Sequence, residues 1–150
     1  MQLTRFTDLG LRVLMYLTQP SRVDPVTNAE IATQFEVPHN HVIKVVHRLG
    51  VLGWVRTQRG RNGGIALGVP AEQLRIGDVM RALEETDQLV DCAKPPCPLR
   101  GGCLLKHALD AGLASFYETM NRYTLADVVS SATSSKLVTL HRRYVGGSPG

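Results

Sequence analysis

The feature that most limits how this chain can fold is an amphipathic helical segment with a β-hairpin directly after it. The helix is predicted by apolar residues at positions i, i+3, i+4 and i+7, namely Val42, Val45, Val46 and Leu49. Gly50 is well placed to end it. Residues 54–58 and 65–67 are rich in β-forming side chains, and the glycine-rich segment 59–64 between them is typical of a turn. We therefore expect a mostly helical unit with one small hairpin.

Two helical segments precede this one. Apolar residues follow a helical period over residues 3–17, and the segment stops before Pro20. Thr27 and Glu30 have the spacing of a capping box, with Thr27 as N-cap and Glu30 reaching back to it, at the start of a short second helix. Pro38 fits the first position of the third helix, which leaves the cap of that helix unidentified.

The outward face of the third helix is polar and cationic. Two short helices joined by a tight turn, the second with donors on its outer face, have the pattern of a helix-turn-helix. The hairpin after it is similar to the wing of a winged helix, because glycines let its tip approach a phosphate backbone and arginine suits a narrow minor groove. A surface helix that happens to be basic is the alternative explanation. The predicted DNA contacts are Asn40, His41, Lys44, Arg48, Arg56, Arg59, Arg61 and Asn62.

The charge distribution agrees with a polyanionic partner. The formal net charge is +4. Residues 1–66 hold eight Lys or Arg and four acids, whereas the other 84 residues hold nine of each. Five basic residues and no acid lie between Glu36 and Glu72. Such asymmetry suits phosphate neutralisation, although a solvated basic face without a partner would also account for it.

The C-terminal half is predicted to be helical on both sides of an irregular segment. One helix is expected from Ile76 to near Glu84 and Glu85, and another over residues 105–123. Thr124 has the spacing to start a further short helix. The apolar stripe of the long helix fits either core packing or the seam of a dimer. One compact domain is expected, organised as a winged helix-turn-helix region (1–84), a cysteine loop (85–104), a dimerisation helix with the C-terminal segment (105–142) and a disordered tail (143–150).

All three cysteines lie in the irregular segment, at Cys92, Cys97 and Cys103. Prolines and glycines between them forbid regular structure, so something else must organise this loop. Unreactive cysteines normally lie in a core, and structural zinc sites use closer pairs and four ligands. The wider C-x4-C-x5-C spacing therefore favours an iron–sulfur cluster over zinc. A fourth ligand is open at this point, with His107 or a carboxylate from elsewhere as candidates.

Several classes are excluded by what the sequence lacks. A composition of 43% hydrophobic and 20% charged residues argues against a disordered chain. We find no apolar run long enough to cross a bilayer and no signal peptide, so a cytoplasmic protein with no membrane partner is expected. An odd number of cysteines speaks against a disulfide framework. An enzyme is not expected, because no nucleophile–base pair, phosphate loop or paired carboxylate motif occurs.

Five stretches carry a resemblance to a known family: MQLTRFTDLGLR, RGRNGGIALG, RIGDVMRALE, CAKPPCPLRGGC and YTLADVV. They resemble the NsrR type of nitric-oxide-sensing repressor, in the winged-helix iron–sulfur family that also contains IscR. The resemblance implies a homodimer on dyad operator DNA with one cluster per subunit, [4Fe-4S] in preference to [2Fe-2S]. It implies Cys92, Cys97 and Cys103 as ligands, with Asp8 of the other subunit as the fourth. IscR-like proteins instead use a His shortly after the third cysteine, so His107 stays a candidate.

The resemblance thus predicts a transcriptional repressor that responds to nitric oxide. Loss of the cluster would release the loop and Asp8, and the two DNA-binding heads would lose their fixed separation. An IscR-like regulator of cluster assembly and a zinc-stabilised winged-helix DNA-binding protein are the alternatives. Spacing alone explains Asp8 differently, as an i,i+4 surface pair with Arg12.

Overall fold

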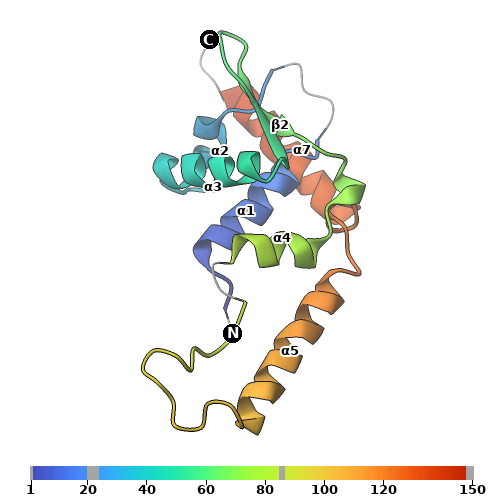
Figure 1. Ribbon diagram of the computed structural model, residues 1–150. Coiled ribbons are helices and arrows are strands. Elements are labelled where there is room, and N and C mark those ends of the chain that lie inside the picture. Colours follow the sequence, from blue (N-terminus) through green and yellow to red (C-terminus); the bar gives the residue numbers. More distant parts are fainter. Residues whose placement is uncertain (1, 20–23, 85–86, 148–150) are drawn as a thin grey trace.

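Figure 1 shows a computed structural model of the chain, in which residues 2–19, 24–84 and 87–147 are described. The elements are α1 (Arg5–Tyr16), α2 (Asn28–Gln34), α3 (His39–Val51), β1 (Val55–Gln58), β2 (Gly64–Leu67), a 3-10 turn η1 (Ala71–Gln73), α4 (Ile76–Leu83), α5 (Leu104–Met120), α6 (Leu125–Val128) and α7 (Ala132–Gly147). One antiparallel hairpin among helices confirms the predicted fold class. Pro20, residues 85–86 of the predicted cysteine loop and residues 148–150 of the predicted tail lie outside the described residues.

The N-terminal helices and the hairpin share one core. Buried apolar side chains of α1, α2 and α3 contribute to it, and they include the predicted stripe of α3: Val13, Leu14, Ile31, Val42, Val45, Val46 and Leu49. The hairpin pairs Val55 with Leu67 and Gln58 with Gly64. A further bridge from Val26 to Ile65 joins β2 to the segment before α2. The wing is therefore joined along β2 to the segment before α2, at a residue next to the pair that closes the turn end of the ladder.

The ends of α3 differ from the prediction. Gly50 lies inside the helix, and the chain leaves it at Gly53, whose φ of 75° is in the left-handed region that favours glycine. The amide of Trp54 then donates to the carbonyl oxygen of Leu49 at 3.0 Å, which satisfies one of the last carbonyls of the helix. Pro38 takes the N-cap position rather than the first helical position, and it offers no side-chain cap.

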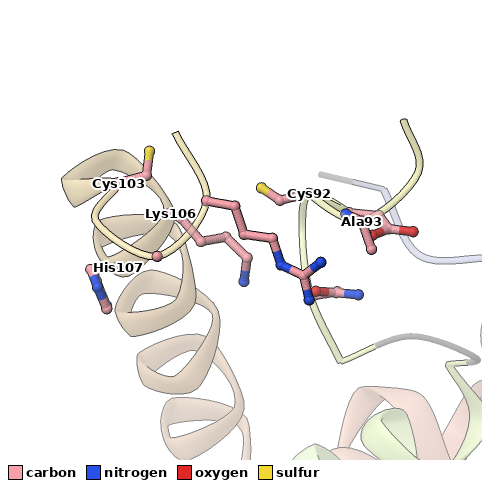
Figure 2. A pocket seen from close by; sticks show the side chains of 9 residues that line it. Cys92, Ala93, Cys103, Lys106 and His107 are labelled. Carbon is pink, nitrogen blue, oxygen red and sulfur yellow. The ribbon is translucent and has the colours of Figure 1, made fainter. Parts of the chain in front are cut away.

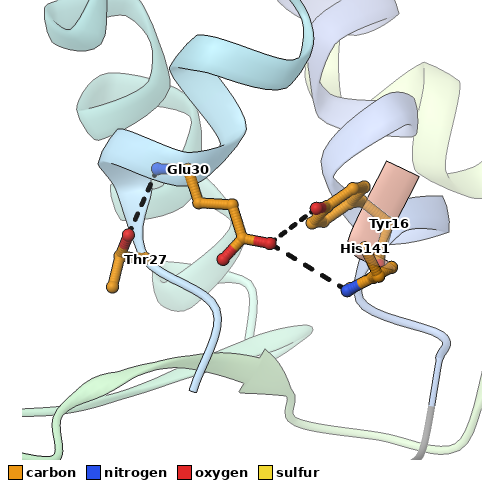
Figure 3. Close-up of polar contacts among 4 residues, drawn as sticks. All are labelled: Tyr16, Thr27, Glu30 and His141. Carbon is orange, nitrogen blue, oxygen red and sulfur yellow. Dashed lines mark hydrogen bonds and ion pairs between the residues drawn. The ribbon is translucent and has the colours of Figure 1, made fainter. Parts of the chain in front are cut away.

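Glu30 has a different role from the one its spacing predicted. The Thr27 hydroxyl does accept from the Glu30 amide at 3.2 Å, so the N-cap is confirmed. The Glu30 carboxylate, however, is fully buried and accepts from the Tyr16 hydroxyl at 2.6 Å (Figure 3). The reciprocal half of the capping box is therefore wrong, because the buried Tyr16 offers the carboxylate a donor away from water.

The same buried contact attaches the C-terminal helix to the N-terminal ones. His141 of α7 stacks on the Tyr16 ring at 4.1 Å, and its Nδ1 lies 4.0 Å from Glu30 Oε1. Its Nε2 lies 3.0 Å from the Tyr16 carbonyl oxygen, which can only accept, so Nε2 is the donor in this contact. Residues 143–147 continue this helix, so the predicted disordered tail is wrong for them.

The joint between α4 and α5 sets the direction of the long helix. A Cβ on Gly77 would collide with the carbonyl oxygen of Tyr117, so the two helices meet at contact distance only because position 77 has no side chain. The Asn121 side chain accepts from the Asp78 amide and donates to the Asp78 carboxylate, both at 2.8 Å. Arg75 donates to the Asn121 carbonyl oxygen at 2.8 Å. The C-terminal end of α5 is thereby held against the first turn of α4.

The predicted apolar stripe of the long helix is only partly buried. Leu113 and Tyr117 are buried near the joint with α4. Leu104 and Leu105, at the other end, are 83% and 66% exposed. Figure 1 shows why: α5 extends away from the other helices, with the cysteine loop at its far end.

Candidate functional site

The outward face of α3 is open to solvent over its whole length. Asn40, His41, Lys44 and His47 are all exposed, and the opposite face is buried in the core. The helix contains no acidic residue. A helix of this kind, fixed on one side and cationic on the other, can enter a DNA major groove with its side chains directed at base edges and phosphates.

Arg48 is partly engaged within the chain itself. Its guanidinium donates to the carbonyl oxygen of Ala82, near the end of α4, at 3.2 Å. The side chain is still exposed. Of the four DNA contacts predicted on α3, Arg48 is thus the one that also ties this helix to α4.

The wing presents its predicted residues to solvent. Arg56, Arg59, Arg61 and Asn62 are all exposed, and Val55 is the buried residue of β1. At the end of the hairpin away from the turn, the Gly68 amide donates to the Trp54 carbonyl oxygen at 2.8 Å. This bond extends the pairing of β1 and β2 by one step. The arginines therefore project from a short hairpin whose second strand is joined to the segment before α2.

The cysteine loop lies between α4 and α5, and all three thiols are free and half-buried. Two backbone hydrogen bonds shape its middle: the Cys97 amide donates to the Cys92 carbonyl oxygen, and the Arg100 amide to the Cys97 carbonyl oxygen, both at 3.1 Å. A cavity of about 370 Å³ is lined by loop residues and by the first turn of α5 (Figure 2). Its lining includes Cys92, Cys103, Arg100, Lys106 and His107.

The donor set suits a cluster in chemistry, but this arrangement does not close a site. Thiolates are soft ligands that hold iron, and Cys92 and Cys103 line one cavity together with His107. Cys97 is absent from that lining. Within residues 2–19, 24–84 and 87–147, no three His, Cys, Asp or Glu side chains lie close enough together to hold a metal ion.

Asp8 lies on α1 and not at the cavity. Its carboxylate is 2.9 Å from the Arg12 guanidinium, and both side chains are 51% exposed. The surface pair that spacing alone explains is therefore present. Because Asp8 is half exposed on the outside of its own fold, it is accessible to a second chain.

Two sets of positioning residues were missed by sequence reasoning. Arg100 and Lys106 place positive charge beside the two thiols of the cavity, and Lys106 pairs with Asp110 one turn further along α5. The i,i+4 spacing of that pair was readable in the sequence. The joint between Asp78 and Asn121 had no such signal, because the two residues are 43 positions apart.

A buried three-helix head, an exposed acid-free outer helix and an anchored hairpin carrying arginines define a winged helix-turn-helix regulator. Residues 3–131 match the Rrf2 family, described as an iron-dependent transcriptional regulator, and the chain belongs to this family. It is therefore a transcriptional regulator and not an enzyme, as predicted. The described part of the chain contains no helix that is long and apolar enough to cross a membrane.

Solved structures share this fold. The global cysteine regulator CymR of B. subtilis has a TM-score of 0.70 at 23% identity, covering 87% of this chain and 97% of that one. IscR of T. potens has a TM-score of 0.71 at 21% identity, covering 91% of each chain. The oxidized form of CymR from Staphylococcus aureus has a TM-score of 0.69 at 22% identity, covering 88% and 98%. The narrower resemblance to the NsrR type stays a prediction.

Proposed function

We propose that this chain is a nitric-oxide-responsive repressor that binds operator DNA as a homodimer. The observation that carries the DNA-binding part is the continuous exposure of the acid-free face of α3 beside an arginine-bearing wing. In this proposal α3 enters the major groove and the wing arginines contact phosphates or the adjacent minor groove.

The homodimer would form through the exposed half of α5. Leu104 and Leu105 lie on a helix that projects from the body, and exposed leucines on such a helix suit burial against a second copy. A symmetric pair of heads matches a dyad operator, whose half-sites lie one helical turn or a multiple apart.

The cysteine loop would hold the sensor. Cys92, Cys97 and Cys103 are proposed to bind one iron–sulfur cluster per subunit, [4Fe-4S] in preference to [2Fe-2S], with Asp8 of the other subunit as the fourth ligand. When bound, the cluster supplies iron that nitric oxide can attack. The loop must close to bring Cys97 to the two thiols of the cavity. Its prolines and glycines leave it without the helical or sheet hydrogen bonds that would oppose such a change.

The route from loop to DNA runs through residues of this chain. The loop leads directly into α5, and the Asn121 side chain of α5 caps α4 through the Asp78 amide. The end of α4 in turn accepts from Arg48 of α3. A change in how the loop is held can therefore reach the DNA-binding helix through hydrogen-bonded neighbours.

An IscR-like regulator is the second candidate, because a specific observation favours it. His107 lines the same cavity as Cys92 and Cys103, whereas Asp8 is paired with Arg12 elsewhere. In that case His107 of the same chain, and not Asp8 of the other, would complete the ligand set.

Anaerobic purification with iron and sulfide assays tests the proposal, followed by nitric oxide titration of a DNA-binding assay. We expect brown protein whose affinity for DNA falls as nitric oxide is added. Any one of Cys92→Ala, Cys97→Ala or Cys103→Ala should abolish the visible absorption and specific DNA binding while circular dichroism stays native. Colourless, zinc-containing protein that still bound its DNA would contradict the cluster.

The two candidate ligands are separated by a matched pair of variants. Asp8→Ala should alter the absorption spectrum, speed the loss of colour in air and weaken DNA binding, whereas His107→Ala should change little. The reverse pattern would move this protein to the IscR type of ligation.

A further inference from the structure

Ile43 and Val51 are the large apolar side chains exposed on α3, and Ile43 is the one that lies among the polar residues of its outward face. It is 42% exposed, although the four buried residues of this helix lie on the opposite side. Single exposed apolar residues are common on protein surfaces, so the exposure itself requires no explanation. The position of Ile43 relative to its neighbours carries the argument.

Helical spacing places Ile43 beside Asn40, a predicted DNA contact, and His47, an exposed residue of the same helix. Asn40, Ile43 and His47 stand at i, i+3 and i+7, so they form one row along the outward face. The two flanks of this row are fixed by contacts. Arg48 lies on one flank and reaches α4, whereas Gly50 lies on the other flank, where a Cβ would sit 3.7 Å from the Val55 carbonyl oxygen of β1. Ile43 stands seven residues before Gly50, so within the row it is the member nearest the side of the helix that meets β1.

The chemistry of the major groove assigns an apolar side chain a definite partner. Each base pair presents hydrogen-bond donors and acceptors there, and thymine alone adds a C5-methyl group. Asn40, Lys44 and His47 can bond to polar base edges, but none of them recognises a methyl group. A β-branched side chain in a helix has one strongly preferred χ1 rotamer, so Ile43 loses little freedom when it is covered.

We infer that Ile43 contacts the C5-methyl group of a thymine in each half-site of the operator, and that it sets a thymine preference there. This inference rests on the proposed function, because it requires α3 to lie in the major groove. It adds a specificity determinant that the polar residues of the helix do not provide.

The test removes the methyl group from the DNA. A duplex is first selected from a random pool with the full-length, anaerobically purified protein, and each thymine is then replaced in turn by deoxyuridine. Burial of one methyl group corresponds to about a fourfold change in affinity. We expect one thymine per half-site at which deoxyuridine weakens binding about fourfold, and roughly 15-fold when both half-sites are changed.

Ile43→Ala identifies the side chain that reads the methyl group. In this variant the same deoxyuridine substitutions should change affinity by less than about 1.5-fold, because the contact is already lost. Val51→Ala is the matched control, since Val51 is a β-branched residue, 65% exposed, at the end of the same helix. It should keep the wild-type sensitivity to deoxyuridine. Neither exposed substitution should lower the Tm measurably.

The outcomes separate the two levels of the argument. If the wild type and Ile43→Ala lose the same factor at every thymine, Ile43 does not read a methyl group and this inference is wrong, while DNA binding stands. If the selection yields no duplex that is bound in preference to competitor DNA, the proposed function fails, and the inference fails with it.

Discussion

Replacing Tyr16 with Phe removes a single oxygen from the centre of the buried contact between α1, α2 and α7. The ring stays, so its stacking on His141 at 4.1 Å and its edge contact with Phe35 at 5.7 Å are retained. What disappears is the 2.6 Å hydrogen bond from the hydroxyl to the Glu30 carboxylate, which is fully buried. The variant therefore isolates one charge-assisted hydrogen bond.

The expected loss of stability follows from that geometry. Hydrogen bonds to charged groups contribute about 1.5–3 kcal/mol. We expect the free energy of unfolding to fall by about 2 kcal/mol. For a chain of this length that corresponds to a decrease in Tm of roughly 4–8 °C.

Urea denaturation followed by circular dichroism measures this change. The slope m of the free energy against urea concentration should equal the wild-type slope, which shows that the variant differs in stability alone. Tyr123→Phe is the matched control, because Tyr123 is 50% exposed, and its loss of the hydroxyl should stay within about 0.5 kcal/mol of wild type. In a Glu30→Gln background the effect of Tyr16→Phe should shrink to about 1 kcal/mol, the value for a neutral pair. A Tyr16→Phe protein as stable as Tyr123→Phe would show that the hydroxyl does not stabilise the buried carboxylate.

Three further predictions concern the joint, the wing and the short helix α6. Gly77→Ala should destabilise the fold by about 1–3 kcal/mol in the same denaturation assay, because its Cβ collides with the Tyr117 carbonyl oxygen; an unchanged midpoint would contradict the close approach of α4 and α5. Arg59→Ala should cost roughly 1–3 kcal/mol of DNA affinity and reduce the salt slope by about 1, and an unaltered slope would remove Arg59 from the phosphate contacts. A hydrogen bond from the backbone amide of Thr124 lowers the pKa of the Asp127 carboxyl. The ionised carboxylate of this capping box therefore stabilises the folded chain above the unfolded pKa, and that stabilisation is lost as the pH falls through the lower folded pKa. An NMR titration of Asp127 with a midpoint at or above 3.8 would contradict this.

Local patterns predicted the elements whose side chains meet within a few residues. The stripe of α3, the hairpin and the start of a short helix at Thr124 all depend on contacts between near neighbours, and all are present. Thr27 and Glu30 show the limit of this reasoning. Their spacing fits a full capping box, with both side chains bonded to backbone amides, and it fits equally an N-cap in which only the Thr27 side chain takes part. The choice is made by Tyr16, 14 positions from Glu30 in sequence, and this donor has no local signature.

The candidate site divides in the same way. Composition and spacing located the basic face of α3, the wing arginines and the cysteine loop, because each depends on one short segment. They could not show that His107 shares a cavity with two thiols, or that Arg48 reaches α4, since both depend on how distant helices pack. The stripe of α5 could not decide between core packing and a dimer seam, because that depends on how far α4, only eight residues long, covers the helix.

The close contact at Gly77 holds α5 near its C-terminal end, so a rotation of α5 about this contact moves its other end the most. The 17 residues of α5 span about 25 Å, and the cysteine loop is attached at the end opposite this contact. A rotation of about 10° at the joint would displace that far end by about 4 Å. Conversely, a displacement of about 4 Å at the cysteine loop would change the angle between α5 and α4 by about 10°. A shorter α5 would turn through a larger angle for the same displacement of the loop, but it would extend less far toward a second subunit. The length of α5 therefore affects both quantities in opposite directions.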